Sequence, residues 1–207
     1  MKITVKAGTI GKLKTGACAV MLFEKEKLGS FAARADRALG GMIEKLISRG
    51  DFTPKAGSVT ALYPEGDLAA DRLFLVGLGA KKDFTAEKLR LASARAAVSA
   101  RAAGAKDLVI AADVSLPAGE DAGQALAEGA LLGLYRFLRY KTGNNDNGEK
   151  ELSSLTLLAE RASQVKALAQ GARTGEIIAS AFLMARDMVS SPSADMTPAT
   201  IAGIARS

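Results

Sequence analysis

Residues 17–23 read ACAVMLF, seven apolar side chains in an unbroken run. Residues 72–79 follow a similar pattern with RLFLVGLG, and residues 107–111 with DLVIA. A strand that is buried on both faces carries such a run, because neither alternating set of side chains meets water. Each run precedes a stretch with helical spacing. The sequence therefore predicts an α/β domain whose mixed, mostly parallel sheet is flanked by helices.

The remaining elements are predicted from weaker patterns. Further strands are expected around Ile3 and Val5, at 58–63 and at 155–159. Apolar stripes predict helices at 31–48, 85–104 and 121–137, and a long one at 163–188. Thr197 and Pro198 open a last short helix, as its N-cap and first helical residue. Residues 141–150 are expected to form an exposed loop.

Composition excludes several kinds of catalytic site. The 207 residues include no histidine, which rules out a Ser-His-Asp triad, a Cys-His dyad and an HExxH zinc helix. The single cysteine excludes a disulfide framework and a cysteine metal cluster. Cys18 lies inside an apolar run and is expected to be inert. The carboxylates are scattered, so no catalytic, cofactor-binding or metal-ligating residue is predicted at any position.

The positive charge is concentrated near the N-terminus. The whole chain carries +6, and residues 1–50 account for all of it, with ten basic side chains against four acidic ones. The basic residues are Lys2, Lys6, Lys12, Lys14, Lys25, Lys27, Arg34, Arg37, Lys45 and Arg49. A solvated rim explains such a surface, and attraction of nucleic acid or anionic lipid is the alternative. No aromatic platform is interleaved with these charges, which weakens the nucleic-acid interpretation.

The sequence shows no targeting or membrane segment. The apolar run at 17–23 is followed at once by EKEK, where a signal peptide needs small residues. No stretch approaches the ~20 apolar residues that span a bilayer. The chain is therefore expected to be cytoplasmic, without a membrane partner.

Gly77 and Gly79 end a predicted buried strand. They resemble half of a phosphate-binding turn, but the complete GxGxxG pattern would need glycine where Lys82 stands. A tight turn that leaves no room for a Cβ explains both glycines, with an anion site as the alternative.

Two glycine pairs have helical spacing, Gly129 with Gly133 and Gly171 with Gly175. They are expected to let helices approach closely. A basic cluster lies at the end of the helix predicted at 121–137 and consists of Arg136, Arg139, Tyr140 and Lys141. Its positive charges suit the negative end of the helix dipole, which explains the cluster. An anion site is the alternative there.

The last residues predict a boundary rather than a finished domain. The final helix, at 197–207, barely reaches one typical helix length of ~11–12 residues, and no later element covers its Ile201, Ile204 and Ala205. We expect a cut between domains here, with a natural terminus as the alternative.

Three ordered segments resemble the leucyl aminopeptidase, or cytosol aminopeptidase, family. Residues 181–198, AFLMARDMVSSPSADMTP, are similar to the ARDLVN-type entry to its catalytic domain, with Ser190 and Asp195 at places where asparagine is common. Residues 76–79, VGLG, resemble a strand end of the family. Residues 128–141, EGALLGLYRFLRYK, resemble its EGxxLxxYxFxxYK helix.

This resemblance implies a two-part cytoplasmic enzyme that forms hexamers. A macro-like N-terminal domain (1–160) would join through a linker helix (161–188) to the start of the catalytic domain (189–207). The family removes N-terminal amino acids from peptides with two divalent ions, Zn²⁺ or Mn²⁺, held by Asp, Glu and Lys side chains. Its NTDAEGRL-type ligand motif is absent from these 207 residues, so the resemblance assigns no catalytic, cofactor or metal residue here.

The resemblance also implies the partners. As a non-catalytic N-terminal domain, the chain would contact its own catalytic domain and further copies of itself, and so serve assembly and access of peptides to the active site. The alternative is a ligand-binding macro-like module for DNA or, less favoured without a phosphate loop, ADP-ribose. An enzyme active by itself is the least favoured interpretation.

Overall fold

The computed structural model describes residues 1–11, 13–65, 68–113, 119–141 and 151–206. Its centre is a six-stranded sheet in the order β1-β6-β5-β2-β4-β3. The strands are β1 (Lys2–Ala7), β2 (Ala17–Glu24), β3 (Val59–Leu62), β4 (Leu73–Ala80), β5 (Asp107–Ala112) and β6 (Ser154–Ala159). Every neighbouring pair is parallel except β3 with β4. The predicted mixed, mostly parallel sheet is confirmed.

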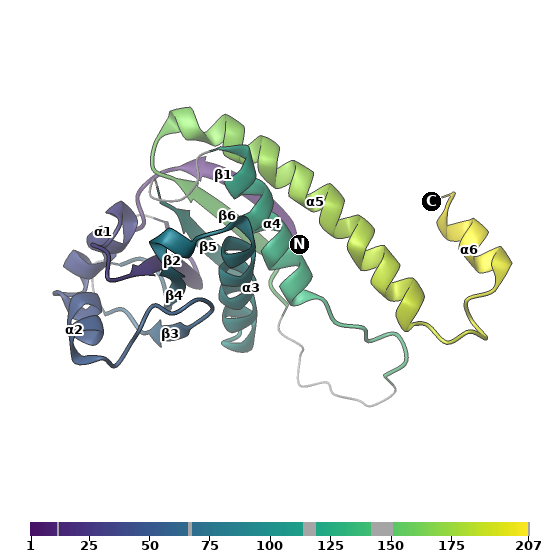
Figure 1. Cartoon of the computed structure of the whole chain (residues 1–207), viewed down its shortest axis with the longest axis horizontal. Coiled ribbons are helices and arrows are strands. Elements are labelled where there is room, and N and C mark those ends of the chain that lie inside the picture. Colours follow the sequence, from purple (N-terminus) through teal and green to yellow (C-terminus); the bar gives the residue numbers. More distant parts are fainter. Residues whose placement is uncertain (12, 66–67, 114–118, 142–150, 207) are drawn as a thin grey trace.

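Helices cover both faces of this sheet (Figure 1). One face carries α1 (Ser30–Ala38) and α2 (Met42–Arg49), and the other carries α3 (Ala86–Ala102), α4 (Glu120–Leu134) and α5 (Ala162–Ser190). The short elements are η1 (Lys81–Asp83) and α6 (Pro198–Ile204). The loop predicted at 141–150 lies, except for Lys141, outside the described residues.

The apolar run of β2 is explained by this double cover. Cys18, Val20 and Leu22 join the core beneath α1 and α2. Their alternating neighbours Ala17, Ala19 and Met21 join the core beneath α3 and α4. Because both sets are buried, an alternation of polar and apolar residues would have placed polar side chains inside one of the two cores.

The prediction of a single helix at 31–48 is wrong. Gly40 and Gly41 have φ angles of +62° and +80°, which interrupts the helix between α1 and α2. The buried carboxylate of Asp36 accepts hydrogen bonds from the backbone N–H groups of Ile43 (2.7 Å) and Glu44 (3.2 Å). Asp36 thus caps the second helix, and this cap requires that the chain turn at the two glycines.

The helix predicted at 121–137 also ends early. Its last residue is Leu134, whose carbonyl oxygen accepts a hydrogen bond from Arg101 Nη1 at 2.7 Å. Tyr135 then adopts an extended conformation (φ −58°, ψ 134°). The basic side chains from Arg136 to Lys141 are therefore outside the last turn of α4, and the helix-dipole explanation for them is wrong.

Two N-caps that the sequence predicts are confirmed. The Thr85 hydroxyl accepts from the N–H of Lys88 at the start of α3, and the Thr197 hydroxyl accepts from that of Thr200 at the start of α6. Both are the N-caps that the pattern predicts.

Glycines join α3, α4 and α5 into one layer. A Cβ added to Gly129 would lie 2.2 Å from the carbonyl oxygen of Arg90 on α3, and one added to Gly133 would lie 2.7 Å from the Ala94 side chain. On the other flank of α4, a Cβ added to Gly171 of α5 would lie 1.8 Å from the carbonyl oxygen of Glu120. The close approach predicted for the glycine pairs is confirmed.

The contact between α4 and α5 is made from both helices. Gly123 of α4 faces the Leu168 carbonyl oxygen, which a Cβ would approach to 2.1 Å. Gly175 of α5 faces that of Gln124, at 2.6 Å from an added Cβ. Since these distances are far below van der Waals contact, the two backbones can approach this closely only where a glycine of one helix faces a carbonyl oxygen of the other.

We predict that Gly171→Ala lowers the free energy of unfolding by about 1–3 kcal/mol, because the new methyl group forces α5 away from α4. Urea denaturation followed by circular dichroism measures this. Gly203→Ala in α6 is the matched control: no atom lies within 4 Å of its added Cβ, so stability should stay the same or rise slightly. Equal behaviour of the two variants would contradict the backbone contact.

Candidate functional site

The carboxyl ends of β2 and β5 form the crevice where sheets of this class usually bind ligands. The chain leaves β2 for α1 on one face and β5 for α4 on the other, which makes their boundary a topological switch point. Asp113, which follows β5, reaches across this crevice. Its Oδ2 accepts hydrogen bonds from the N–H of Phe31 (3.2 Å) and the hydroxyl of Ser30 (3.4 Å).

Asp113 thereby occupies the N-terminus of α1. The residue is buried, 8% exposed, and a Cβ at Gly29 would lie 2.3 Å from its Oδ2. A helix N-terminus attracts an anion, and here the chain supplies its own carboxylate. This contact argues against a phosphate ligand such as ADP-ribose at α1.

Gly77 and Gly79 lie within β4, where the register with β2 shifts between Leu22 and Phe23. Gly79 has φ +77°, and a Cβ on Gly77 would lie 2.1 Å from the carbonyl oxygen of Lys55. The two N–H groups donate to Ser58 (2.9 Å) and Pro54 (2.9 Å). The predicted turn is wrong, because both glycines lie inside β4, but the lack of room for a Cβ is confirmed, and neither N–H is available for an anion.

Cys18 has the expected inert environment. Its side chain is 1% exposed between two layers of the core. Burial raises the pKa of its thiol to about 12, although a hydrogen bond with the Ala19 backbone lowers it slightly. The reactive thiolate is therefore not populated near neutral pH.

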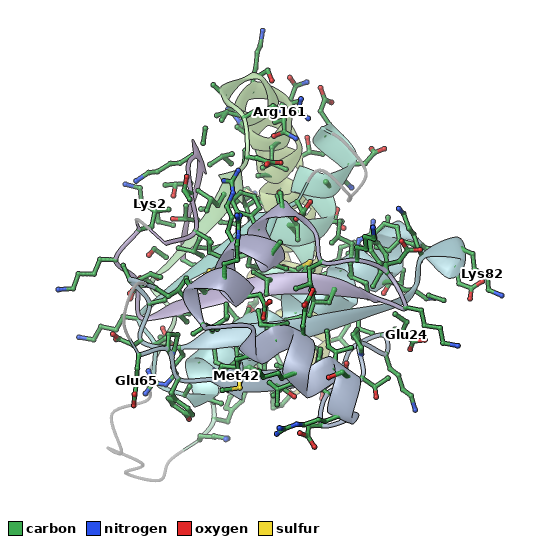
Figure 2. All side chains as sticks on the ribbon, turned by 90° about the vertical axis from the view of Figure 1, so that its left-hand side faces the viewer. Lys2, Glu24, Met42, Glu65, Lys82 and Arg161 are labelled. Carbon is green, nitrogen blue, oxygen red and sulfur yellow. The ribbon has the colours of Figure 1, made fainter. Side chains whose placement is uncertain are left out.

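The basic residues of the first fifty positions do not gather on one element. Lys2 and Lys6 lie on β1, at the edge of the sheet, whereas Lys45 and Arg49 lie on α2. Figure 2 shows Lys2 and Glu24, the start of β1 and the end of β2, on opposite sides of the molecule. Arg34 is paired with Glu160 at 3.4 Å, and Lys12 lies outside the described residues. This distribution fits the solvated rim better than a nucleic-acid groove.

A groove of about 580 Å³ lies between α3, α4 and α5. Its apolar walls are Leu91, Ala94, Leu132, Ile178 and Phe182. Its polar end is formed by Glu87, Arg90, Gln124, Glu128 and Arg186. The glycines 129 and 133, where α3 and α4 touch, form its floor.

A buried carboxylate organises the polar end of this groove. The Glu128 side chain is 5% exposed and accepts a hydrogen bond from Nε of Arg90. Its second oxygen accepts from Gln124 Nε2 at 2.6 Å, while Arg90 also reaches Glu87 at 3.0 Å. The hydrogen bond to Glu128 raises the pKa of Arg90 further above its ordinary value, against the smaller effect of desolvation.

Sequence reasoning missed the role of Glu128. It assigned significance to the following residue, Gly129, and left the glutamate without a function. The available signal was an acidic residue among the apolar residues of the helix, between Leu126 and Ala130. A carboxylate on a buried stripe needs a charged partner, and Arg90 on the neighbouring helix supplies it.

The second half of α5 exposes large apolar side chains. Ile177, Phe182, Met184 and Val189 are 65%, 57%, 48% and 87% exposed, respectively. The first half is anchored by buried residues such as Leu168 and Ala172. In Figure 1 α5 passes along α4 and its end projects beyond the sheet. An apolar surface of this kind is typical of an interface.

The described residues hold no cluster of three or more His, Cys, Asp or Glu side chains that suits a metal ion. Within the same parts of the chain, no helix combines the length and the apolar character needed to cross a bilayer.

The comparisons with known proteins point in one direction. Residues 19–144 match the model of the cytosol aminopeptidase family, N-terminal domain. A probable cytosol aminopeptidase of Nitrosococcus oceani is 35% identical over 209 residues, which cover 100% of this chain and 42% of that protein. One from a Geobacter species is 37% identical over 210 residues, covering 100% and 41%. The chain thus spans about two fifths of the length of these curated relatives.

Solved structures agree on the fold. A variant of tomato leucine aminopeptidase superposes with a TM-score of 0.79 at 20% identity, over 100% of this chain and 41% of that one. The bottromycin maturation enzyme BotP, in complex with Mn, gives a TM-score of 0.65 at 26% identity, over 93% and 35%.

We predict that Arg90→Ala lowers the free energy of unfolding by about 1–3 kcal/mol, because it leaves the buried Glu128 carboxylate without its cation. Chemical denaturation of the two proteins measures the difference. Arg95→Ala on the same helix is the control, since Arg95 is exposed and makes no ion pair with the described residues. If both variants are equally stable, the pair does not contribute as argued.

Proposed function

The chain belongs to the cytosol aminopeptidase family, and from this premise we propose that it is the non-catalytic N-terminal part of a metal-dependent leucyl aminopeptidase. The complete enzyme would remove N-terminal amino acids from peptides in the cytoplasm. In this proposal, residues 1–160 form the N-terminal domain, residues 161–188 form the linker helix, and residues 189–207 begin the catalytic domain. The relatives named above carry more than half of their length outside the matched region.

The observation that carries the proposal is the division of α5. Its first half is held against α4 by backbone contacts at Gly171 and Gly175. Its second half presents exposed Phe182 and Val189, which are costly to leave in water. A helix that is buried at one end and apolar at its free end suits a connection to a second domain of the same protein.

We assign this domain a role in assembly and in access to the active site. An additional domain on a symmetric oligomer can contribute to interfaces and restrict which substrates enter. The proposed assembly is a hexamer. The filled crevice at Asp113 and the scattered basic residues favour this role over a ligand-binding or DNA-binding module.

The proposed metal chemistry lies outside this chain. Two divalent ions, Zn²⁺ or Mn²⁺, would activate a water molecule and polarise the scissile carbonyl. BotP is named in complex with Mn. The residues described here do not fit such a centre, since they offer no group of three acidic or thiol ligands. We therefore assign none of them to catalysis.

The test is hydrolysis of Leu-p-nitroanilide with Mn²⁺ or Zn²⁺ by three proteins. They are this chain, the complete Geobacter relative, and a chimera in which this chain is joined after residue 206 to the C-terminal three fifths of that relative. We expect activity from the relative and the chimera and none from the chain. Hydrolysis by the chain alone would contradict a non-catalytic role. An inactive chimera beside an active relative would contradict the proposed connection.

The alternative is tested on the same preparation. Duplex DNA is titrated with the chain at low and at moderate salt. We expect no shift of the duplex at low salt. A complex that weakens steeply as salt rises would instead establish a nucleic-acid module.

A further inference from the structure

The segment from Tyr135 to Lys141, which we call the strap, leaves α4 and runs to the projecting end of α5. In Figure 1 it continues past the end of α4 toward the region where α5 ends and the chain turns to α6. The helix ends at Leu134, whose carbonyl oxygen accepts a hydrogen bond from Arg101. The extended conformation of Tyr135 then directs the chain outward.

The first attachment of the strap is at Tyr135. Its hydroxyl donates a hydrogen bond to Oδ1 of Asp187 at 2.8 Å, and the guanidinium of Arg186 lies 5.5 Å from the centre of its ring. The main-chain carbonyl of the same Asp187 accepts from both the N–H (3.1 Å) and the hydroxyl (2.7 Å) of Ser191. Asp187 therefore links the strap to the residue at which α5 ends.

The second attachment is at Tyr140. Its hydroxyl donates to the carboxylate of Asp195, which lies in the turn before α6, where its own N–H donates to the Pro192 carbonyl. The ring of Phe137 lies 5.7 Å from that of Tyr140, and the Arg139 guanidinium lies 5.6 Å from it. The strap thus holds one point on α5 and one beyond it.

Two attachments restrict the orientation of the end of α5 more than a single attachment can. The backbone contact between α4 and α5 reaches Gly175, and the sixteen residues from there to Ser191 span about 24 Å of helix. A small bend at the anchored end moves the far end of such a lever by several ångströms. One hydrogen bond leaves it free to rotate about that bond, whereas two bonds on either side of Ser191 fix its direction.

We propose that Tyr135 and Tyr140 are positioning residues, which hold the end of α5 and the turn before α6 in one orientation relative to the α3–α4 layer. In the complete enzyme this orientation would set where the catalytic domain sits, a consequence that rests on the proposed function. The orientation itself is a property of this chain.

The titration of the tyrosines is consistent with this role. Partial desolvation, followed by the hydrogen bond to Asp187, raises the pKa of Tyr135. The hydrogen bond to Asp195, followed by desolvation, raises the pKa of Tyr140. Hydrogen bonds with Ser190 and Ser191, followed by the charges of Arg186 and Arg139, lower the pKa values of Tyr135 and Tyr140 by smaller amounts. Both attachments are therefore intact at neutral pH, where the tyrosines carry their protons.

The experiment measures the distance between nitroxide labels at Val189→Cys and Arg95→Cys by double electron–electron resonance. Both positions are exposed, and the buried Cys18 does not compete for the label. The chain that keeps Tyr135 and Tyr140 should give a narrow distribution of distances between the two labels. In Tyr135→Phe/Tyr140→Phe, released orientations should gain about thirtyfold in population, as expected from the loss of two hydrogen bonds of ordinary strength.

Two controls separate positioning from general damage. Tyr63→Phe alters the third tyrosine, which is 71% exposed and makes no hydrogen bond within the described residues, and should leave the distribution narrow. Asp187→Ala should broaden it, whereas Asp187→Asn keeps an acceptor oxygen and should restore the narrow form. Circular dichroism reports whether each variant is folded. An unchanged distribution in the folded double-phenylalanine variant would overturn the proposal, whether or not the chimera hydrolyses its substrate.

Discussion

The close contact between α4 and α5, in which glycines of each helix face carbonyl oxygens of the other, is the constraint on which the position of α5 depends. Gly123 and Gly171 face carbonyl oxygens that an added Cβ would approach to 2.1 and 1.8 Å. On its opposite flank, α4 meets α3 through Gly129. The three helices form one layer, and the buried Glu128 joins two of them through Arg90. This layer fixes the direction of α5, and the exposed second half of α5 depends on that direction.

The fold occupies two possible ligand sites with its own groups. The carboxyl ends of β2 and β5 are the place where related α/β sheets take ligands. Here Asp113 satisfies the N-terminus of α1, and Gly77 of β4 donates its N–H to Ser58. The features open to a partner lie instead on the helical layer, in the groove beside Phe182 and along the end of α5. Such an arrangement suits a domain whose partners are other parts of a protein.

The strands were predictable because burial on both faces leaves an unbroken apolar run, as in β2. The glycine pairs were predictable because few other reasons place glycine four residues apart on a helix. The break at Gly40 and the end of α4 at Leu134 were not found. At the first, the Asp36 side chain folds back to cap the next helix, and at the second, the last carbonyl oxygen meets Arg101 of another helix; the apolar spacing records neither contact. The pairing of Glu128 with Arg90 and the hydrogen bonds of the strap also join residues that no local pattern connects. The family resemblance came from ordered motifs, and it supplied the functional role that composition and spacing did not.

The central claim is that α5 is anchored over its first half and presented over its second. Hydrogen exchange along α5 in this chain measures it most directly, because each amide reports the free energy of its own opening. We expect slow exchange through Leu168 and Gly171, where the helix is buried against α4, and markedly faster exchange around Phe182. Uniform strong protection from one end of α5 to the other would contradict it, since the second half would then be as firmly packed as the first.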